Sequence, residues 1–292
     1  MTLIISSVCC AAGLCSPGLC ENIAMKLNIV PARVGLTWVT LGIKTFFQQP
    51  LALSGLFFMF MAMLSIATLV PFVGSALALA LLPAATLGLM AATQEATKGK
   101  FPMPTILISA FRAGRQQFRA MMVLGGLYAV GFLALMGVSA LVDGGDFAQL
   151  YLLGGKMTEE MVLQSDFQAA MWVTLLLYMP LSLLFWHAPA LVHWHGVPPV
   201  KSLFFSLMAC TSNWRALTVY GLAWLGVFSV AVLVVTLVAV LLGNPAFAAL
   251  AMFPVALLIM AMFFISLYFT FRDSFEMPPE SPAEGVPTPD IS

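Results

Sequence analysis

Six long runs of apolar residues dominate the pattern of this chain, and short polar or basic stretches separate them. An α-helix rises about 1.5 Å per residue, so about 20 apolar residues are needed to cross a hydrocarbon core about 30 Å thick. Each run meets this length, which predicts an all-α fold, a polytopic membrane helical bundle of about six transmembrane helices. The predicted spans are residues 51–70, 72–93, 120–142, 169–191, 217–242 and 247–271.

Proline and glycine mark the turns between paired spans. Pro71 alone separates the first two spans, and the Gly-Asn-Pro stretch at 243–245 separates the last two, so each pair is expected to form a tight helical hairpin. Proline also occurs inside the spans, where a neighbouring helix can satisfy the freed carbonyl group and a kink is the usual result. These internal positions are Pro83, Pro180, Pro189 and Pro254.

Three segments next to the spans mix aromatic and aliphatic residues with a few polar or basic ones: residues 34–49, 105–118 and 200–214. They are too polar to span a membrane and too apolar to be free linkers. The pattern predicts cytoplasmic interfacial helices that lie at the membrane surface and lead into the next span. The alternative is that each segment extends the following span as one long bent helix.

The same segments share a sparse motif of a proline, an aromatic residue 16 positions later and a small residue 7 positions after that. We interpret them as three hairpin repeats, each made of a surface helix, an elbow and two spans. Proline suits the first turn of a helix, the aromatic residue is expected at headgroup depth, and the small residue would let another helix approach closely. The three sets are Pro31, Phe47 and Ser54, then Pro102, Phe118 and Gly125, then Pro198, Trp214 and Gly221.

Composition supports a membrane location and excludes one class of partner. Of the 292 residues, 61% are hydrophobic and 8% are charged, whereas soluble domains carry about 25% charged residues. The chain therefore has too few charged side chains to cover a surface that is exposed to water. Lys and Arg number 12 and the formal net charge is zero, so no basic face is large enough for nucleic-acid binding.

Positive charges gather on one side of the predicted spans. The side that holds the N-terminus has eleven Lys or Arg residues and the opposite side has only Lys156, an asymmetry that predicts a cytoplasmic location for both termini. Between the third and fourth spans, residues 143–166 form an acidic loop, in which 147–163 is expected as a short helix on the membrane surface. The eleven basic residues are Lys26, Arg33, Lys44, Lys98, Lys100, Arg112, Arg115, Arg119, Lys201, Arg215 and Arg272.

Three short strings in the second half of the chain stand out: Ala188-Pro189-Ala190-Leu191-Val192, Pro198-Pro199-Val200-Lys201-Ser202-Leu203, and Tyr268 with Arg272-Asp273-Ser274-Phe275. Together they resemble an uncharacterised family of bacterial six-span inner-membrane proteins. The similarity extends over residues 25–275, which we take as the membrane domain. It implies a six-span fold in the bacterial inner (plasma) membrane and carries no assigned activity.

Two terminal segments lie outside this domain. Residues 1–24 hold four of the five cysteines but no basic residue before their apolar stretch, which makes a poor signal peptide. We interpret them as an unstructured extension that results from the choice of start site, because Met25 offers a natural start. A cytoplasmic thiol or metal cluster is the alternative. Residues 276–292 are rich in proline and acids and are expected to form a disordered cytoplasmic tail.

Histidines offer one candidate for chemistry. His187, His193 and His195 lie near the cytoplasmic end of the fourth span, but on a regular helix His193 is about 240° and His195 about 80° away from His187. A metal or proton-handling site would need a break near Pro189 or Gly196. We favour interfacial histidines that flank an aromatic belt.

Other signals of chemistry are sparse. No span has Asp, Glu, Lys or Arg in its central third, which weakens the case for an ion-coupled transporter. Cys210 is expected to be an apolar filler, and hydroxyls within spans more often join helices than bind cargo. The chain has no glycine-rich phosphate loop, paired carboxylates or nucleophile elbow, so we expect no enzymatic activity and no catalytic, cofactor or metal residues. The hydroxyl residues are Thr174, Tyr178, Ser182, Tyr220, Ser229 and Thr236.

The expected function is a lipid- or protein-binding role in membrane organisation, with membrane lipids as partners and other membrane proteins as further candidates. The candidate lipid-facing elbow consists of Phe118, Arg119, Trp214 and Arg215, in which each aromatic residue sets the depth of a cation near anionic headgroups. A permease or channel for a small or lipophilic solute is the alternative, and it requires hydroxyls that converge on a polar cavity at mid-membrane. A membrane-embedded enzyme is a third hypothesis and requires the three histidines to converge.

Overall fold

The computed structural model describes residues 2–4, 26–71, 73–109, 114–154 and 157–275. Within these ranges it contains six helices that are long and apolar enough to cross a membrane, which confirms the prediction of an all-α bundle with six spans. The spanning helices are α3 (Pro50–Thr68), α4 (Gly74–Thr97), α6 (Arg115–Asp143), α9 (Ser165–Phe185), α12 (Trp214–Leu241) and α13 (Pro245–Ser274).

The fourth span is broken near its end, and this differs from the single span predicted over 169–191. Helix α9 ends at Phe185, the chain bends, and α10 (Ala188–His195) begins with Pro189 in its first turn. Proline has no N–H to donate and its ring clashes with the carbonyl group four residues earlier, so a helix cannot pass through Pro189 without distortion. In contrast, Pro83, Pro180 and Pro254 lie inside continuous helices.

The last hairpin turns at the predicted Gly-Asn-Pro stretch. Gly243 adopts a φ of 61°, a left-handed conformation that glycine adopts without strain. The side chain of Asn244 then caps α13 by accepting a hydrogen bond from the backbone N–H of Ala246 at 3.1 Å, and Pro245 occupies the first turn. The turn residues therefore fix the tight hairpin that the sequence predicts.

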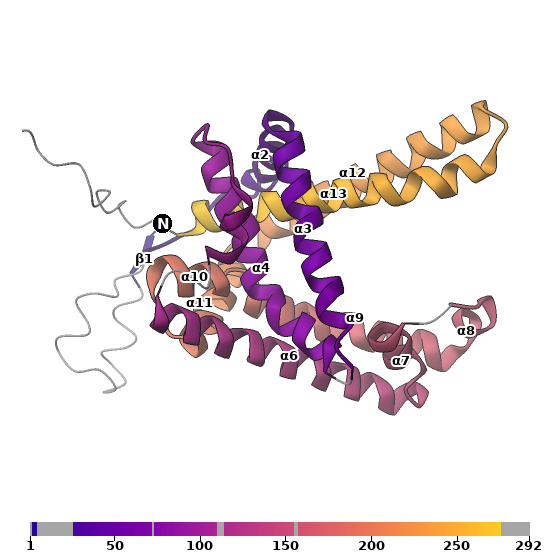
Figure 1. Cartoon of the computed structure of the whole chain (residues 1–292), viewed down its shortest axis with the longest axis horizontal. Helices are drawn as coiled ribbons and strands as arrows, with labels where there is room; N and C mark the ends of the chain where they lie inside the picture. Colours follow the sequence, from indigo (N-terminus) through magenta and orange to yellow (C-terminus); the bar gives the residue numbers. More distant parts are fainter. Residues whose placement is uncertain (1, 5–25, 72, 110–113, 155–156, 276–292) are drawn as a thin grey trace, which may run out of the picture.

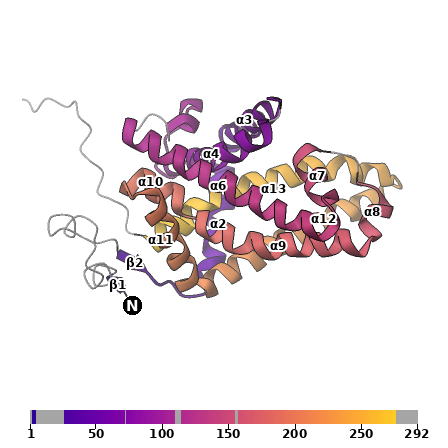
Figure 2. The same ribbon diagram turned by 90° about the horizontal axis from the view of Figure 1, so that it is seen from below.

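Helix α4 lies at the centre of the packing, against α3, α6 and α13. Helices α4 and α6 approach closely at Gly125 of α6, where an added Cβ would overlap the carbonyl oxygen of Ala80. Helices α6 and α9 pack side by side, as do α12 and α13 (Figures 1 and 2). In Figure 1 the α12–α13 hairpin projects away from the other helices. Gly125 thus has the role predicted for the small residue of the motif, whereas Gly221 has no atom within 4 Å of an added Cβ and does not.

Two of the three predicted interfacial segments form separate helices, α2 (Val34–Gln48) and α11 (Pro199–Ser212). Non-helical backbone at Gln49 and Asn213 separates them from α3 and α12, so they do not extend these spans as long bent helices. Helix α2 packs against α12 and α13 and buries Trp38 and Phe46. It is therefore a packed part of the bundle and not a helix that rests on its surface.

The second segment departs from the prediction. Pro104–Ile108 forms a short 3-10 helix, η1, residues 110–113 lie outside the described ranges, and α6 has already begun at Arg115. The bend before α6 is at Gly114, with a φ of 113°. Phe118 consequently lies four residues after its bend, whereas Trp214 directly follows the bend at Asn213. The predicted elbow at Phe118 is wrong in position, and the threefold repeat stays a prediction.

The acidic loop contains two short helices where the sequence predicts one. Helix α7 (Asp146–Leu153) and helix α8 (Glu159–Leu163) are separated by Gly154 and a stretch in which Gly155 and Lys156 lie outside the described residues. A positive φ of 78° at Gly154 ends α7, because a non-helical backbone there stops the hydrogen-bond ladder.

Two short strands complete the described elements. Strand β1 (Thr2–Ile4), within the segment predicted to be unstructured, pairs antiparallel with β2 (Lys26–Asn28), and Leu27 also pairs with Phe275 after α13. Residues 5–25 and 276–292, which carry the predicted cysteine-rich segment and tail, lie outside the described residues, as does Arg112.

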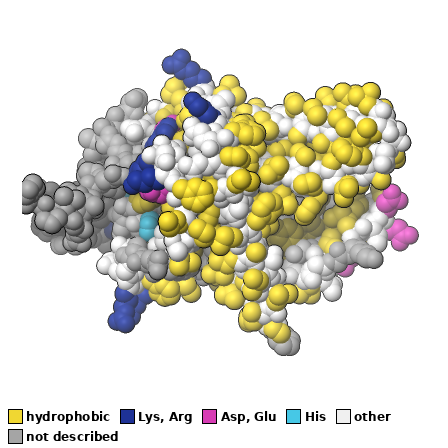
Figure 3. All heavy atoms as spheres, turned by 45° about the horizontal axis from the view of Figure 1, so that its top comes forward, with side chains coloured by type: hydrophobic (Ala, Val, Ile, Leu, Met, Phe, Trp, Pro, Cys, Tyr) yellow, Lys and Arg dark blue, Asp and Glu magenta, His cyan; other side chains and the backbone are white. Residues whose placement is uncertain are grey.

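Charge divides the molecule into two ends. We call the end where α4 and α13 terminate and α6 and α12 begin the basic end, and the end that carries α7 and α8 the acidic end. Figure 3 shows basic side chains gathered toward one end and a cluster of acidic ones at the other, with a mainly hydrophobic surface between them. Large apolar side chains such as Leu176 and Leu250 are 73% and 78% exposed there. This surface suits contact with lipid chains and not with water.

Candidate functional site

Most basic side chains at the basic end are free of carboxylate partners. Six of them are exposed and form no ion pair with any residue that the structure describes: Arg33, Lys44, Arg115, Arg119, Lys201 and Arg215. Charge that the protein leaves uncompensated is available to an anionic surface. The end of the bundle is thus electrostatically matched to anionic headgroups.

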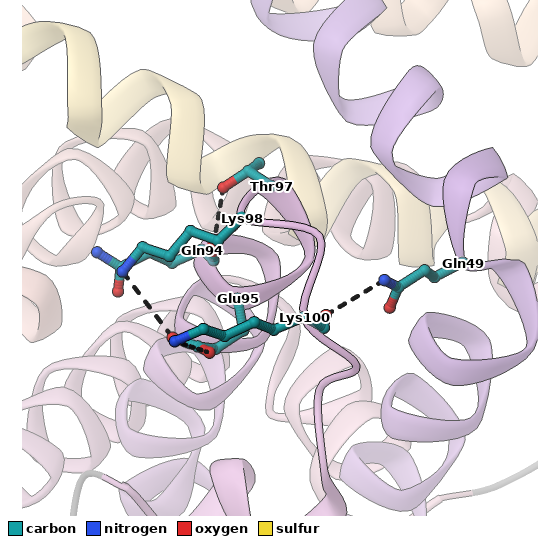
Figure 4. Close-up of polar contacts among 6 residues, drawn as sticks. All are labelled: Gln49, Gln94, Glu95, Thr97, Lys98 and Lys100. Carbon is teal, nitrogen blue, oxygen red and sulfur yellow. Dashed lines mark hydrogen bonds and ion pairs between the residues drawn. The ribbon is translucent and has the colours of Figure 1, made fainter.

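The two carboxylates that the structure describes at this end, those of Glu95 and Asp273, have basic or indole partners. Glu95, near the end of α4, lies 4.0 Å from the Nζ of Lys98 and 3.9 Å from the Nζ of Lys100 (Figure 4). The Nε2 of Gln49 donates a hydrogen bond to the carbonyl oxygen of Lys100 at 3.2 Å and so joins the α2–α3 bend to the end of α4. Sequence reasoning missed this cluster, although a single glutamate three and five residues before two lysines is a visible signal.

Asp273, near the end of α13, forms the second engaged site. Its Oδ2 accepts a hydrogen bond from the indole Nε1 of Trp38 at 2.8 Å, and its Oδ1 lies 2.8 Å from the Nε of Arg272. The Arg272 guanidinium also lies 5.0 Å from the ring centroid of Phe269. This group ties the first helix of the membrane domain to the last, and it is also absent from the predictions.

Asn213, at the bend before α12, is a buried polar residue that holds the chain entering the bundle. Its Oδ1 accepts from the backbone N–H of Val30 at 2.9 Å, and its Nδ2 donates to the carbonyl oxygen of Asn28 at 3.0 Å. The side chain is only 2% exposed. A buried amide that satisfies two backbone groups fixes position, which makes Asn213 a structural residue.

The four residues of the candidate elbow form two separate pairs at the starts of two spans. Trp214 is 58% exposed, and the guanidinium carbon of Arg215 lies 5.5 Å from the centroid of its ring, a cation–π contact. Phe118 is 42% exposed, and Arg119 is exposed in the second turn of α6. The pairs lie on different hairpins at the same end of the bundle.

The break between α9 and α10 places two histidines against one pair of aromatic rings. The His187 ring centroid lies 5.9 Å from that of Phe271 and 5.6 Å from that of Phe275, and His195 lies 5.8 and 6.4 Å from the same rings. His193 instead contacts Trp194, at 6.2 Å. Within the described residues, no three His, Cys, Asp or Glu side chains lie close enough to hold a metal ion. The arrangement is an aromatic cluster that includes histidine rings.

Cys210 lies buried in α11. Its thiol is 3.7 Å from the carbonyl oxygen of Leu183, and burial raises the pKa of the thiol to about 12, against a smaller opposing effect of the Ser206 hydroxyl. The thiolate is the reactive form of cysteine. A thiol with so high a pKa is a packing group at neutral pH.

The hydroxyls of the spans lie in different places. Tyr220 and Ser266 bond to each other at 2.7 Å and join α12 to α13, and Ser182 bonds within its own helix to the carbonyl oxygen of Met179. Thr174 and Tyr178 line a mainly apolar cavity of about 320 Å³ between α6, α7 and α9. The first pair joins two helices as predicted, whereas Thr174 lines the cavity and its hydroxyl has no hydrogen-bond partner in the described structure.

Comparison with known proteins gives one informative relative. A probable inner membrane protein of Burkholderia thailandensis is 40% identical to this chain over 259 residues, which cover 86% of this chain and 94% of that protein. No protein-family model and no solved structure matches. The relative agrees with the resemblance to bacterial inner-membrane proteins that the sequence motifs suggested.

Proposed function

We propose that this chain, which belongs to the family of the probable inner membrane protein of Burkholderia thailandensis and is a multi-pass inner-membrane protein, binds anionic lipid at its basic end. In this proposal the protein organises the membrane around its basic end and catalyses no reaction. The basic end lies in the cytoplasm in this proposal, because positively charged residues are retained on that side of the membrane. Both termini then lie in the cytoplasm as well.

The observation that carries the proposal is the set of six exposed basic side chains without an ion pair in the described part of the chain. Near a surface of anionic lipid each such charge contributes about 1 kcal/mol at physiological salt. Among the residues that the structure describes at this end, the two carboxylates, those of Glu95 and Asp273, are held by other partners. Cations that are unpaired at one end of a membrane protein face the headgroup layer, whose phosphates supply the opposite charge.

The starts of α6 and α12 add to this attraction. Neither helix has an acidic residue in its first turn, and neither has a side-chain hydrogen bond at its N-cap. The unpaired N–H groups and the positive end of the helix dipole favour an anion there. Trp214, exposed beside Arg215, is amphipathic and prefers headgroup depth, which would hold the cation level with lipid phosphates.

Native mass spectrometry of the purified protein tests the proposal. The protein is mixed with equal amounts of phosphatidylglycerol and phosphatidylcholine of the same acyl chains, at low and at high salt. We expect several-fold more phosphatidylglycerol retained at low salt and a smaller excess at high salt, because screening weakens exposed ion pairs. Equal retention of the two lipids at low salt would contradict the proposal.

A further inference from the structure

A cavity at the acidic end has the features of a second and different lipid site. It has a volume of about 320 Å³ and lies between the last turns of α6, the helix α7 and the outer half of α9. This size falls at the lower end of the range for ligand pockets in proteins. Its aromatic rings contact one another, with Phe132 at 5.6 Å from Tyr151 and 6.2 Å from Tyr178 between centroids.

One polar group in this cavity lacks a partner. Thr174 is only 8% exposed, and its hydroxyl has no hydrogen bond within the described structure. A threonine inside a helix usually bonds to the carbonyl oxygen four residues earlier, and the Thr174 hydroxyl does not make this bond. A buried hydroxyl without a partner is unfavourable, and an oxygen atom of a bound molecule would satisfy it.

The cavity opens toward the lipid. Trp172 and Leu175, which line it, are 62% and 50% exposed on the outer face of α9. Because this part of α9 lies within a candidate span, hydrocarbon chains surround the opening in the membrane. An acyl chain can therefore enter from the side without crossing water.

Two exposed carboxylates lie next in sequence to aromatic residues at the cavity. Asp146 and Asp166 directly precede Phe147 and Phe167, whose ring centroids are 5.6 Å apart, and Phe147 lines the cavity. Both carboxylates are exposed and have no ion pair in the described part of the chain. They favour a cationic headgroup and disfavour an anionic one.

The spacing of Asp166 and Thr174 along α9 allows one lipid molecule to reach both residues. Asp166 and Thr174 are eight residues apart, or about 12 Å along the helix at 1.5 Å per residue. In an extended phosphatidylethanolamine molecule, the ester carbonyl of an acyl chain and the ammonium group of the headgroup lie a comparable distance apart. We propose that the cavity holds one acyl chain of an amine-headed phospholipid from the leaflet at the acidic end. The Thr174 hydroxyl donates to its ester carbonyl, and its ammonium group faces Asp146 and Asp166.

Filling the cavity tests this site. The full-length protein is titrated in detergent with 1-palmitoyl-2-oleoyl-phosphatidylethanolamine, and bound lipid is counted by native mass spectrometry. Leu175→Trp, which places an indole at the cavity wall, should lower retained lipid at least fivefold. Leu176→Trp is the matched control, because Leu176 is the next residue and is 73% exposed outside the cavity lining, and it should retain lipid as the wild type does. Equal retention by both variants would overturn the proposal.

Two further variants test separately the hydrogen bond to the lipid ester and the contact with the lipid headgroup. Thr174→Val keeps the shape of the side chain and removes the hydroxyl, and it should weaken binding about threefold to tenfold, as expected for one hydrogen bond. Asp146→Asn with Asp166→Asn should abolish the preference for phosphatidylethanolamine over phosphatidylglycerol in the lipid that depends on the cavity, which is the lipid that Leu175→Trp loses, while an acyl chain still binds. A wild-type protein that binds phosphatidylglycerol at this site equally well would contradict the headgroup assignment. Because the basic end is unchanged in all of these variants, failure here leaves the proposed function intact.

Discussion

The indole of Trp38 donates a 2.8 Å hydrogen bond to the Oδ2 of Asp273, across 235 residues of sequence. Trp38 is fully buried, and its ring also contacts that of Tyr220 at 6.0 Å in an edge-on arrangement. One side chain of α2 therefore contacts both helices of the last hairpin. The relationship explains why α2 is a packed element of the bundle and how the first and last parts of the membrane domain are held together.

Replacing Trp38 by Phe should destabilise the protein. The substitution removes the indole donor and leaves the Asp273 carboxylate with Arg272 alone, at a cost of about 1–3 kcal/mol for a lost hydrogen bond to a charged, partly buried group. Thermal unfolding in detergent measures the loss. Trp214→Phe is the control, because Trp214 is 58% exposed and should unfold close to the wild-type temperature. Equal unfolding temperatures for Trp38→Phe and the wild type would show that the bond contributes no stability.

Adjacent glycines on α6 give a sharper test of the central packing. In Gly125→Ala the new Cβ would overlap the Ala80 carbonyl oxygen, so α4 and α6 must separate, at a cost of about 1–3 kcal/mol. In Gly126→Ala the new Cβ meets no atom within 4 Å, and the change should be neutral or slightly stabilising. Unfolding temperatures of the two variants should differ clearly, and a match between them would refute the close contact of α4 with α6.

Cys210 should resist modification in the folded protein. An acid with a raised pKa stays protonated until the pH approaches that pKa, so at pH 8 the thiol is almost entirely un-ionised, and the group is buried as well. With the four N-terminal cysteines replaced by Ser, a small maleimide at pH 8 should label the protein only after denaturation. Mass spectrometry gives the extent of labelling, and rapid labelling of the folded protein would contradict the buried position.

Topology follows from the charge asymmetry. A reporter fused after Thr97 at the end of α4 should be active in the cytoplasm, and one fused after Gly154 between α7 and α8 should be active in the periplasm. Alkaline phosphatase and green fluorescent protein fusions report the two sides. A periplasmic signal from the Thr97 fusion would invert the orientation used in the proposed function.

The six spans could be predicted because lipid imposes a simple requirement on length and hydrophobicity, and each predicted span overlaps one spanning helix. The turn at Gly243 and Asn244 could be predicted for a similar local reason, since its residues decide its conformation. The break before α10 was harder to place, because Pro189 disfavours a helix through it without specifying where the bend begins.

The sites were largely beyond prediction because they join distant segments. The contacts of Asp273 with Trp38 and of Asn213 with Val30 link residues whose proximity no local pattern encodes. The cavity at Thr174 depends on where α7 lies across α6 and α9, and a hydroxyl in an apolar helix gives no sign of this alone. Exposed cations, in contrast, could be identified in advance, since a membrane protein has few places for Arg119 and Arg215 other than its ends.

The lipid-binding role is tested most directly by the two arginines next to exposed aromatic residues. In the variant Arg119→Gln with Arg215→Gln, phosphatidylglycerol that copurifies with the protein is counted by mass spectrometry. Arg33→Gln with Lys201→Gln is the matched control, because it removes the same charge at exposed positions outside the candidate elbow. We predict that the Arg119 and Arg215 variant keeps its six spans and accumulates normally but retains several-fold less anionic lipid than the control. Unchanged lipid in this variant would contradict lipid binding at the basic end, and a loss equal to that of the control would show that the two aromatic–arginine pairs contribute no more than the other exposed cations.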